Sequence, residues 1–358
     1  MSGTSGSATD VLTRAELDAV ASVMAAARTT PAGPLTSRLI SGGKSNLTLR
    51  LTDGERVWVM RTPPRAGRTP SAHDVVREFR VVAALGPTDV PVPPAVVAYP
   101  DEDLIGGAFA ICEYVDGSTV QSREQLARLG DDQVAAAVTG LCRTLAALHR
   151  VDHVAVGLET FGRPDGYAAR QLRRWGGQWQ IVGEHQGAAS HALAHRLADG
   201  LGERLPEQRA TGIVHGDYRI DNTLLRIGGE ADEAGEVGEV EVAAVVDWEL
   251  STIGDPVADV AMMCVYRDPA FDLVIGSEAA WTSDRLPSVE ALAAAYESEG
   301  GVGLHDFDRH LALGYFKLAV IAAGIDHRYR AGATHGEGFD TAGDAVAPLL
   351  EAGLAQLR

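Results

Sequence analysis

The chain has 358 residues, of which 46% are hydrophobic and 22% are charged, as in an ordinary globular protein. This length favours two lobes or domains over one small core. The net charge of −18 argues against nucleic acid or an anionic membrane surface as a non-specific partner.

The cysteines and the N-terminus predict a soluble, cytoplasmic protein. Cys112, Cys142 and Cys264 lie in apolar surroundings without a CxxC spacing, which favours reduced thiols over a disulfide or zinc framework. Residues 1–10 are polar, predict disorder and carry no apolar signal core. No apolar run approaches the roughly 18–20 residues of a membrane span. The sequence does not define an oligomeric state.

The N-terminal part has the alternation of a small antiparallel sheet. Two short strands flank a glycine turn, and Asp53-Gly54 marks a tight turn before the third strand. The strand at 109–115 is buried and is expected to be the last of this lobe and the hinge out of it. The expected elements are a helix at 12–27, strands at 37–40, 47–51, 57–61 and 109–115, a helix at 73–85 and an extended connector at 90–94.

The remainder of the chain is richer in helices. Apolar residues recur at helical spacing in several segments, and a helix is also expected to begin near Pro256. The acidic, glycine-rich stretch 228–241 predicts an exposed hairpin loop between two strands. The expected helices are 131–149, 167–180, 191–205, 289–299 and 307–330.

These elements predict an α+β fold with a small N-terminal antiparallel-sheet lobe and a larger, mainly helical C-terminal lobe. The expected organisation is an N-terminal tail and helix at 1–35, a nucleotide-binding lobe at 36–116, and a catalytic and acceptor-binding lobe at 117–358.

The segment from Ile213 to Leu225 contains the most informative motif, His215-x-Asp217-x-x-x-x-Asn222, and Asp247 follows another apolar run. This order of side chains suits phosphoryl transfer from a magnesium nucleotide to a hydroxyl. Asp217 is the candidate base, while Asn222 and Asp247 offer the hard oxygen ligands that Mg²⁺ prefers. The alternative is a turn or helix-capping motif rich in Asp and Asn.

Other polar residues near this motif have two readings each. Arg219 could neutralise phosphate charge or bind an anionic substrate, or it could be a solvated loop cation. His215 could brace the backbone or touch substrate. Asp255 and Asp259 are expected to cap the following helix or to fix the catalytic loop.

The glycine turn at 42–46 is a candidate lid over nucleotide phosphates. It differs from a Walker A loop, which needs a glycine where Arg38 stands and a helix after the loop. Backbone N–H groups at Gly43 and Lys44, together with Ser45, could donate to phosphates. A plain hairpin turn is the alternative.

Two further groups could contact the nucleotide. A two-lobe kinase needs a cation against the phosphates, anchored by a helix carboxylate. Arg61 on the third strand and Glu78 on the next helix are the candidates, and Arg departs from the expected Lys. Backbone groups of Glu113 and Val115 could pair with the edge of adenine.

On these residues the chain resembles the aminoglycoside phosphotransferase and choline kinase group, relatives of eukaryotic protein kinases, over roughly residues 30–350. Within that group it is similar to the branch that is fused to acyl-CoA dehydrogenases. The motifs that carry the resemblance are His215-Gly-Asp217 through Asn222, Asp247-Trp-Glu249, Gly254-Asp255-Pro256 with Asp259, residues 42–46, Arg61-Thr-Pro63-Pro64, Arg77-Glu78 and Arg170-Gln171-Leu-Arg-Arg174-Trp175.

The resemblance implies a bilobal protein-kinase-like fold that uses ATP and Mg²⁺, with Asp217 as base and Asn222 and Asp247 as metal ligands. It also implies a small-molecule hydroxyl acceptor, either a hydroxyacyl-CoA or related acid or an aminoglycoside-type antibiotic. The helix with Arg170, Arg173, Arg174 and Trp175 would frame the acceptor pocket. A solvated basic helix face is the alternative for these four side chains.

Two rival functions stay open. A nucleotide-binding pseudokinase or regulatory module without turnover is suggested by Arg61 in place of lysine. Phosphorylation of protein side chains is disfavoured, because no activation-segment signature separates Asp247 from the following helix.

Overall fold

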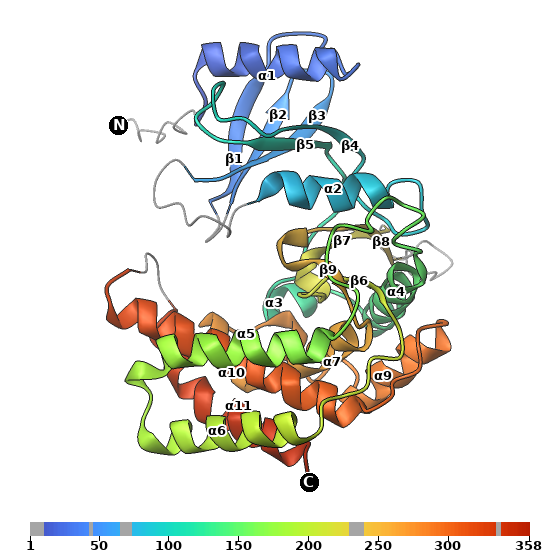
Figure 1. The fold of residues 1–358 in the computed structure, drawn as a ribbon. Coiled ribbons are helices and arrows are strands. Elements are labelled where there is room, and N and C mark those ends of the chain that lie inside the picture. The colour runs from blue at the N-terminus through green and yellow to red at the C-terminus, as the bar shows by residue number, and fades with distance from the viewer. Residues whose placement is uncertain (1–10, 43–45, 65–73, 229–239, 334–337) are drawn as a thin grey trace, which may run out of the picture. The chain divides into compact units, whose positions relative to one another are not determined.

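The computed structural model describes residues 11–42, 46–64, 74–228, 240–333 and 338–358. Its contacts divide the chain into an N-terminal unit, residues 1–116 with 246–249, and a C-terminal unit, residues 117–245 with 250–358 (Figure 1). Gly43, Lys44 and Ser45 lie outside the described residues, as do the first ten residues and most of the acidic stretch.

The N-terminal unit contains a five-stranded sheet with strand order β1-β2-β3-β5-β4, in which all neighbours are antiparallel. The predicted meander is confirmed, and Gly54 closes its second turn with a φ of 96°. β4 was not predicted and follows the proline connector. The strands are β1 (Thr36–Gly42), β2 (Leu47–Thr52), β3 (Val57–Thr62), β4 (Ala95–Tyr99) and β5 (Phe109–Glu113).

Strand alternation gives this sheet two different faces. One face is apolar and packs with Val20 and Met24 of α1 (Arg14–Ala26) into one core cluster. Figure 1 shows α1 on one side of the sheet and α2 (Val75–Leu85) on the other. The sheet residues of the α1 core are Leu49, Leu51, Trp58, Met60, Phe109 and Ile111.

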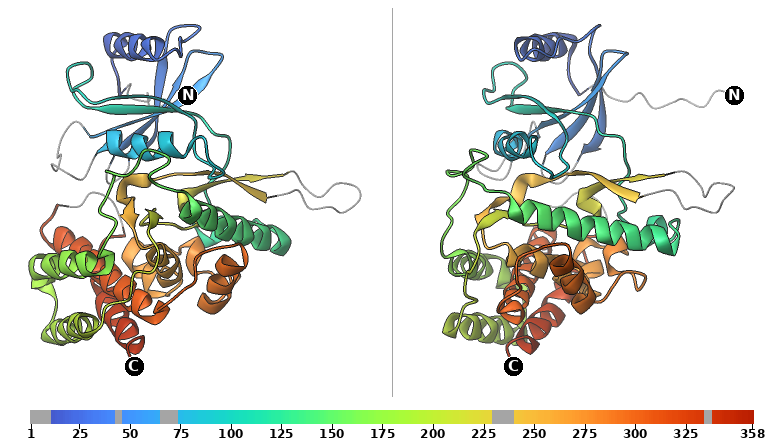
Figure 2. Two further views of the ribbon diagram at one scale, coloured as in Figure 1. Left: turned by 45° about the vertical axis from the view of Figure 1, so that its right-hand side comes forward. Right: turned by 90° about the vertical axis from the view of Figure 1, so that its right-hand side faces the viewer.

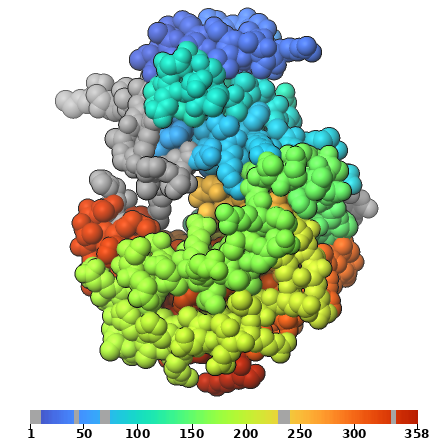
Figure 3. All heavy atoms as spheres, in the orientation of Figure 1, coloured from blue at the N-terminus to red at the C-terminus, as the bar shows by residue number. Residues whose placement is uncertain are grey.

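The C-terminal unit is built around α10 (Phe307–Arg330), which contacts α5, α6, α7 and α11. Figure 3 shows α5 and α6, in green, on one face of this unit, and Figure 2 shows α4 running beside β8. Its longer helices are α4 (Asp131–Arg150), α5 (Tyr167–Val182), α6 (Ala188–Glu203), α7 (Val257–Val265), α9 (Val289–Ser298) and α11 (Val346–Ala355), and its shorter ones are α3 (Arg123–Leu126) and α8 (Ala270–Ile275).

Two short antiparallel strand pairs complete this unit: β6 (Gly212–Val214) with β9 (Thr252–Gly254), and β7 (Thr223–Ile227) with β8 (Val240–Val245). The strands predicted on either side of the acidic stretch are therefore confirmed as the β7–β8 pair, and most of the predicted loop between them lies outside the described residues. The five helices predicted at 131–149, 167–180, 191–205, 289–299 and 307–330 are present, although α6 begins at Ala188 instead of His191, with Gly187 as its N-cap. Within the described residues, no helix is long and apolar enough to cross a membrane.

The free cysteines agree with the predicted reduced thiols. Cys142 and Cys264 are buried and Cys112 is half-buried, and none of the three forms a disulfide. Burial raises the pKa of each thiol to about 12, which disfavours the nucleophilic thiolate form.

We predict that Thr13→Ala loosens α1, because Thr13 and Glu16 form a capping box. The Thr13 N–H donates to Glu16 Oε2 at 2.6 Å, and the Glu16 N–H donates to Thr13 Oγ1 at 3.3 Å. Loss of such a cap costs about 1 kcal/mol. Amide hydrogen exchange across α1 should become several-fold faster. Thr30→Ala, at an exposed residue beyond the helix, is the control, and equal effects of both changes would contradict the prediction.

Candidate active site

The loop that carries the central motif begins at a buried strand and ends at another. β6 is fully buried and pairs with β9, so His215 emerges from a fixed position. After Arg219 the chain forms a single 3-10 turn, η2 (Ile220–Asn222), and enters β7. Behind the loop, the buried Tyr218 hydroxyl donates to the Leu141 carbonyl of α4 at 2.9 Å. The loop is therefore anchored along its whole length.

Gly216 is the point at which this loop is most tightly held. Its N–H donates to Asp259 Oδ1 at 2.7 Å, and its carbonyl accepts from Lys317 Nζ at 2.8 Å. Its φ is 85°, which favours glycine. A Cβ atom here would lie 2.7 Å from the Leu250 carbonyl oxygen. Both backbone conformation and space thus require glycine between His215 and Asp217.

Asp259 lies beneath the loop with no solvent exposure. It accepts a second loop N–H, that of His215, at 2.5 Å, and its Oδ2 lies 3.3 Å from His149 Nε2. His149 Nδ1 is in turn 2.7 Å from the Tyr296 hydroxyl. Burial opposes ionisation, but the contacts with His149 and the loop N–H groups hold the pKa of Asp259 below its usual value. The prediction that Asp259 fixes the catalytic loop is confirmed.

Asp255 lies just before the N-cap residue of α7, which is Pro256. Its Oδ1 accepts the N–H of Val257, the first residue of α7, at 3.1 Å. Burial raises the pKa of this carboxyl to about 6. His215 also braces the backbone, because its Nδ1 accepts the Asp217 N–H at 3.2 Å.

Asp217 and Asn222, five residues apart, are brought into direct contact. The Asn222 amide nitrogen donates to the Asp217 carbonyl at 2.7 Å and to its Oδ2 at 2.9 Å. Burial works against the ionised form of Asp217, but Arg219, the Tyr266 hydroxyl and Lys317 outweigh it and lower the pKa of this carboxyl. Asp217 is consequently an ionised carboxylate, able to accept a proton, and the amide oxygen of Asn222 is directed away from it.

Arg219 is not a solvated loop cation, so that alternative is wrong. Its side chain is 16% exposed and lies 3.4 Å from Asp217 Oδ2 and 3.0 Å from Asp221 Oδ2. The guanidinium carbon is 5.1 Å from the ring centroids of both Tyr266 and Phe271. These cation–π contacts and ion pairs fix a positive charge beside the candidate base.

Lys317 was not predicted as a site residue. It is one of only two lysines in the chain, and it occurs within an apolar stretch of α10. Burial lowers its pKa, although the nearby carboxylates of Asp217 and Asp259 act in the opposite direction. Its Nζ also lies 6.0 Å from the ring centroid of Trp175 on α5. The sequence feature that could have indicated this site residue is a single lysine among the apolar residues of a predicted helix.

The basic side chains of α5 are not all simply solvated, because several of them contact other groups of the protein. Trp175 is half-buried, its indole N–H donates to Gln171 Oε1 at 3.0 Å, and Arg174 lies 5.2 Å from its ring centroid. Arg170 donates to the Arg163 carbonyl at 2.6 Å. The Trp175 ring therefore has a cation from α10 and another from its own helix within about 6 Å, the range of a cation–π contact.

In the N-terminal unit, Arg61 contacts two carboxylates. Its Nε lies 3.1 Å from Glu78 Oε2, and its Nη2 donates to Asp247 Oδ1 at 3.2 Å. The predicted pairing of Arg61 with Glu78 is confirmed. Strand alternation places Arg61 on the α2 side of the sheet, opposite Met60 in the α1 core. The salt bridge is mostly buried, since the Arg61 side chain is 24% exposed and Glu78 8%.

Glu78 is further held by Asn46, a contact that sequence reasoning missed. The Asn46 amide nitrogen donates to Glu78 Oε1 at 2.8 Å, and both side chains are buried. Burial raises the pKa of Glu78 to about 7, against the opposing effect of Arg61. Asn46 directly precedes β2, so this bond ties the start of β2 to α2.

Asp247 adopts a left-handed backbone with a φ of 64°, which is uncommon for a residue other than glycine. Such conformations concentrate at functional sites. At the end of β5, the Glu113 N–H donates to the Pro94 carbonyl at 2.8 Å. Because the Glu113 N–H already has this partner, only the Glu113 carbonyl and the Val115 backbone remain as predicted contacts of adenine.

Comparison with known proteins agrees with this geometry. A sequence profile described as the phosphotransferase enzyme family matches residues 36–303, about three quarters of the chain. The chain belongs to this phosphotransferase family.

One curated relative is acyl-CoA dehydrogenase family member 11 from Gallus gallus, 33% identical over 330 residues. The match covers 90% of this chain but only 40% of that protein. The predicted resemblance to the branch linked to acyl-CoA dehydrogenases is confirmed.

Two solved structures of phosphotransferases have the same fold. A Ralstonia eutropha protein assigned provisionally to the aminoglycoside phosphotransferases has a TM-score of 0.77 and 31% identity, and the match covers 95% of this chain and 97% of that one. A ternary complex of the aminoglycoside phosphotransferase APH(4)-Ia with AMP-PNP and hygromycin B has a TM-score of 0.56 and 18% identity, covering 90% and 93%. The predicted α+β, kinase-like fold class is confirmed.

We predict that Lys317→Met impairs this phosphotransferase in two measurable ways. The buried Gly216 carbonyl loses its donor, which should cost about 1–3 kcal/mol of unfolding free energy. The pKa of Asp217 should rise because a nearby cation is lost, so the acidic limb of the kcat/KM profile should move to higher pH. Denaturant unfolding and pH–rate profiles measure the two effects.

Arg328→Met, at an exposed cation on the same helix, is the matched control. A Lys317→Met enzyme with wild-type stability and an unshifted pH profile would contradict the role given to Lys317.

Proposed function

We propose that this chain is a small-molecule kinase that transfers the γ-phosphoryl group of Mg-ATP to a hydroxyl. The observation that carries the proposal is the geometry at Asp217, whose carboxylate accepts from Asn222 and is flanked by Arg219. A fixed carboxylate of this kind accepts the hydroxyl proton as the oxygen attacks phosphorus. The AMP-PNP complex of the structural neighbour supports nucleotide use.

The donor atoms fit Mg²⁺, which prefers oxygen ligands. The Asn222 amide nitrogen is already bound to Asp217, which leaves the amide oxygen for the metal. Asp247 has one carboxylate oxygen paired with Arg61, which leaves Oδ2 as the anionic ligand. When bound, Mg²⁺ would neutralise charge on the nucleotide phosphates.

Other residues would bind the nucleotide itself. Arg61, oriented by Glu78, would contact phosphate oxygens with its planar guanidinium. The Glu113 carbonyl and the Val115 backbone would pair with adenine, and Gly43, Lys44 and Ser45 would cover the phosphates. Arg219 would offset negative charge beside the base.

The C-terminal unit favours an anionic acceptor. Lys317, which acts on Asp217, is close enough to Arg174 and Arg219 for both to lower its pKa, and Lys317 and Arg174 both lie near the Trp175 ring. A hydroxy acid or hydroxyacyl-CoA would be attracted to these cations, whereas a polycationic aminoglycoside would be repelled. The similarity to an acyl-CoA dehydrogenase family member supports the same choice.

We predict that Asp217→Asn lowers kcat by at least about 100-fold, since only the proton acceptor is lost, while nucleotide affinity stays near wild type. ADP release from Mg-ATP would be measured with hydroxy acids, hydroxyacyl-CoAs, aminoglycosides, choline and macrolides. Asp199→Asn, at an exposed carboxylate of α6, is the control. Equal losses of turnover and of ATP affinity in Asp217→Asn would exclude Asp217 as the base.

We predict that Asp247→Ala weakens nucleotide binding about tenfold or more in the presence of Mg²⁺, or about 1.4 kcal/mol. Without Mg²⁺ the affinity should not fall, because the change also frees Arg61 from its second carboxylate. Calorimetry with and without the metal separates these effects. A loss of nucleotide affinity in Asp247→Ala that persists in EDTA would count against Asp247 as a ligand of Mg²⁺.

A nucleotide-binding module without turnover is the alternative function. One observation favours it: Arg61, which replaces the usual lysine, is paired with Asp247 as well as with Glu78. Bound ATP with no ADP release across the acceptor panel would support this alternative.

A further inference from the structure

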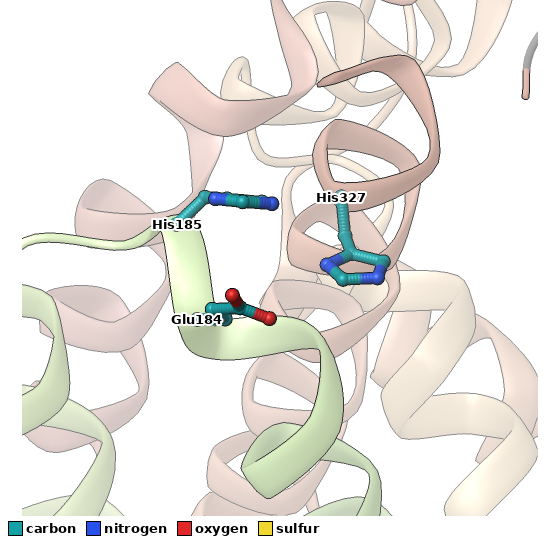
Figure 4. A group of neighbouring side chains, drawn as sticks. All are labelled: Glu184, His185 and His327. Atoms are coloured by element: carbon teal, nitrogen blue, oxygen red, sulfur yellow. The ribbon is translucent and has the colours of Figure 1, made fainter. Parts of the chain in front are cut away.

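A second group of metal-ligating side chains lies in the C-terminal unit, on elements other than the catalytic loop. Glu184 and His185 are on the 3-10 turn η1 (Gly183–His185), and His327 is near the end of α10. One potential ligand atom from each residue lies within 4.8 Å of the other two. Figure 4 shows the carboxylate of Glu184 and the two imidazoles pointing into one space.

The backbone that presents these side chains is fixed. α5 ends at Val182, and η1 turns the chain toward α10. The Gln186 side chain donates to Asp326 Oδ2 at 3.0 Å, which joins the residue after His185 to the residue before His327. Asp326 is buried and also accepts from Arg330 Nε at 2.9 Å. The spacing between the two segments is therefore set by bonds that do not involve the three candidate ligands.

His327 supplies an independent indication of a ligand. Its Nδ1 is buried and has no hydrogen-bond partner among the described residues. A buried nitrogen without a partner costs free energy, and such groups in folded proteins usually have a bound water or ion. The ring lies 5.2 Å from that of His185, with 26° between their planes.

We propose that Glu184, His185 and His327 bind one divalent transition-metal ion, of which Zn²⁺ is the representative. Imidazole nitrogens suit Zn²⁺, Ni²⁺ and Cu²⁺, and a set of two histidines and one glutamate is a known zinc ligand set. Mg²⁺ prefers oxygen ligands and hydration, so the ion proposed at this site differs from the nucleotide-bound metal.

The two imidazole rings are stacked, so coordination of one ion by both requires side-chain rotation. Zn–N bonds of about 2.0–2.1 Å in a tetrahedral site place donors about 3.4 Å apart. Closing a separation of at most 4.8 Å to that value takes torsion changes in Glu184 and His185, which are exposed and can rotate. Three protein ligands leave the fourth position to water, as in open zinc sites.

The bound ion would act as a clip between α5 and α10. Both helices also contribute to the surroundings of the catalytic loop, through Trp175 and Lys317. An ion that binds only the folded chain raises its stability by mass action. Zn²⁺ should therefore raise the melting temperature independently of nucleotide or acceptor, which gives this proposal a readout that does not depend on the proposed kinase activity.

The test uses the full chain without a histidine tag, stripped with EDTA and titrated with Zn²⁺ alone by calorimetry. We expect one ion per chain, and Co²⁺ in its place should give the absorption of a four-coordinate ion. Removing an outer-shell partner of a ligand already costs about 10–100-fold in affinity. His327→Gln and Glu184→Gln should each weaken binding by at least about 100-fold, and His305→Asn, at an exposed histidine elsewhere, should not.

The strongest competitor is the histidine pair His191 and His195 of α6, whose rings lie 6.5 Å apart one helical turn from each other. His191→Asn distinguishes the two sites. Zn²⁺ binding that survives in His327→Gln but is lost in His191→Asn would overturn the proposal, as would the absence of stoichiometric binding by the wild-type chain.

Discussion

The peptide groups around Gly216 are held between two buried charges, and the candidate catalytic loop depends on them. Asp259 accepts the N–H groups of His215 and Gly216, and Lys317 donates to the Gly216 carbonyl. Each charge would be costly to bury alone, but each has hydrogen bonds that satisfy it. Gly216 lies between these two charges in a left-handed conformation and has no space for a side chain. The backbone that leads into Asp217 is therefore held in one conformation.

The distribution of charge around Asp217 runs against that of the whole chain. The protein carries a net charge of −18, yet the cations Arg219 and Lys317 act on the candidate base. Local cations at short range in a poorly hydrated site outweigh distant surface carboxylates, whose effect is screened. Arg219 and Lys317 lower the pKa of Asp217, against the effect of its burial.

In the N-terminal unit, one cation is held against two carboxylates on the α2 side of the sheet. The pleat of β3 turns Met60 into the α1 core and Arg61 to the opposite side. There the guanidinium contacts Glu78 through one nitrogen and Asp247 through another, a geometry that a lysine ammonium does not reproduce. Asn46 completes the arrangement by holding the second oxygen of Glu78.

The sequence by itself determined most of the longer elements and the motif, because both arise from short-range patterns. Helical periodicity marked α10 at its observed limits, and five positions separate Asp217 from Asn222. Only the tertiary structure decided which distant groups support them. Lys317 and Gly216 are 101 residues apart, Asp259 and His215 44, and Arg61 and Asp247 186. Such contacts follow from the packing of separate elements, which local periodicity does not encode, and β4 and the cluster of Glu184, His185 and His327 emerged for the same reason.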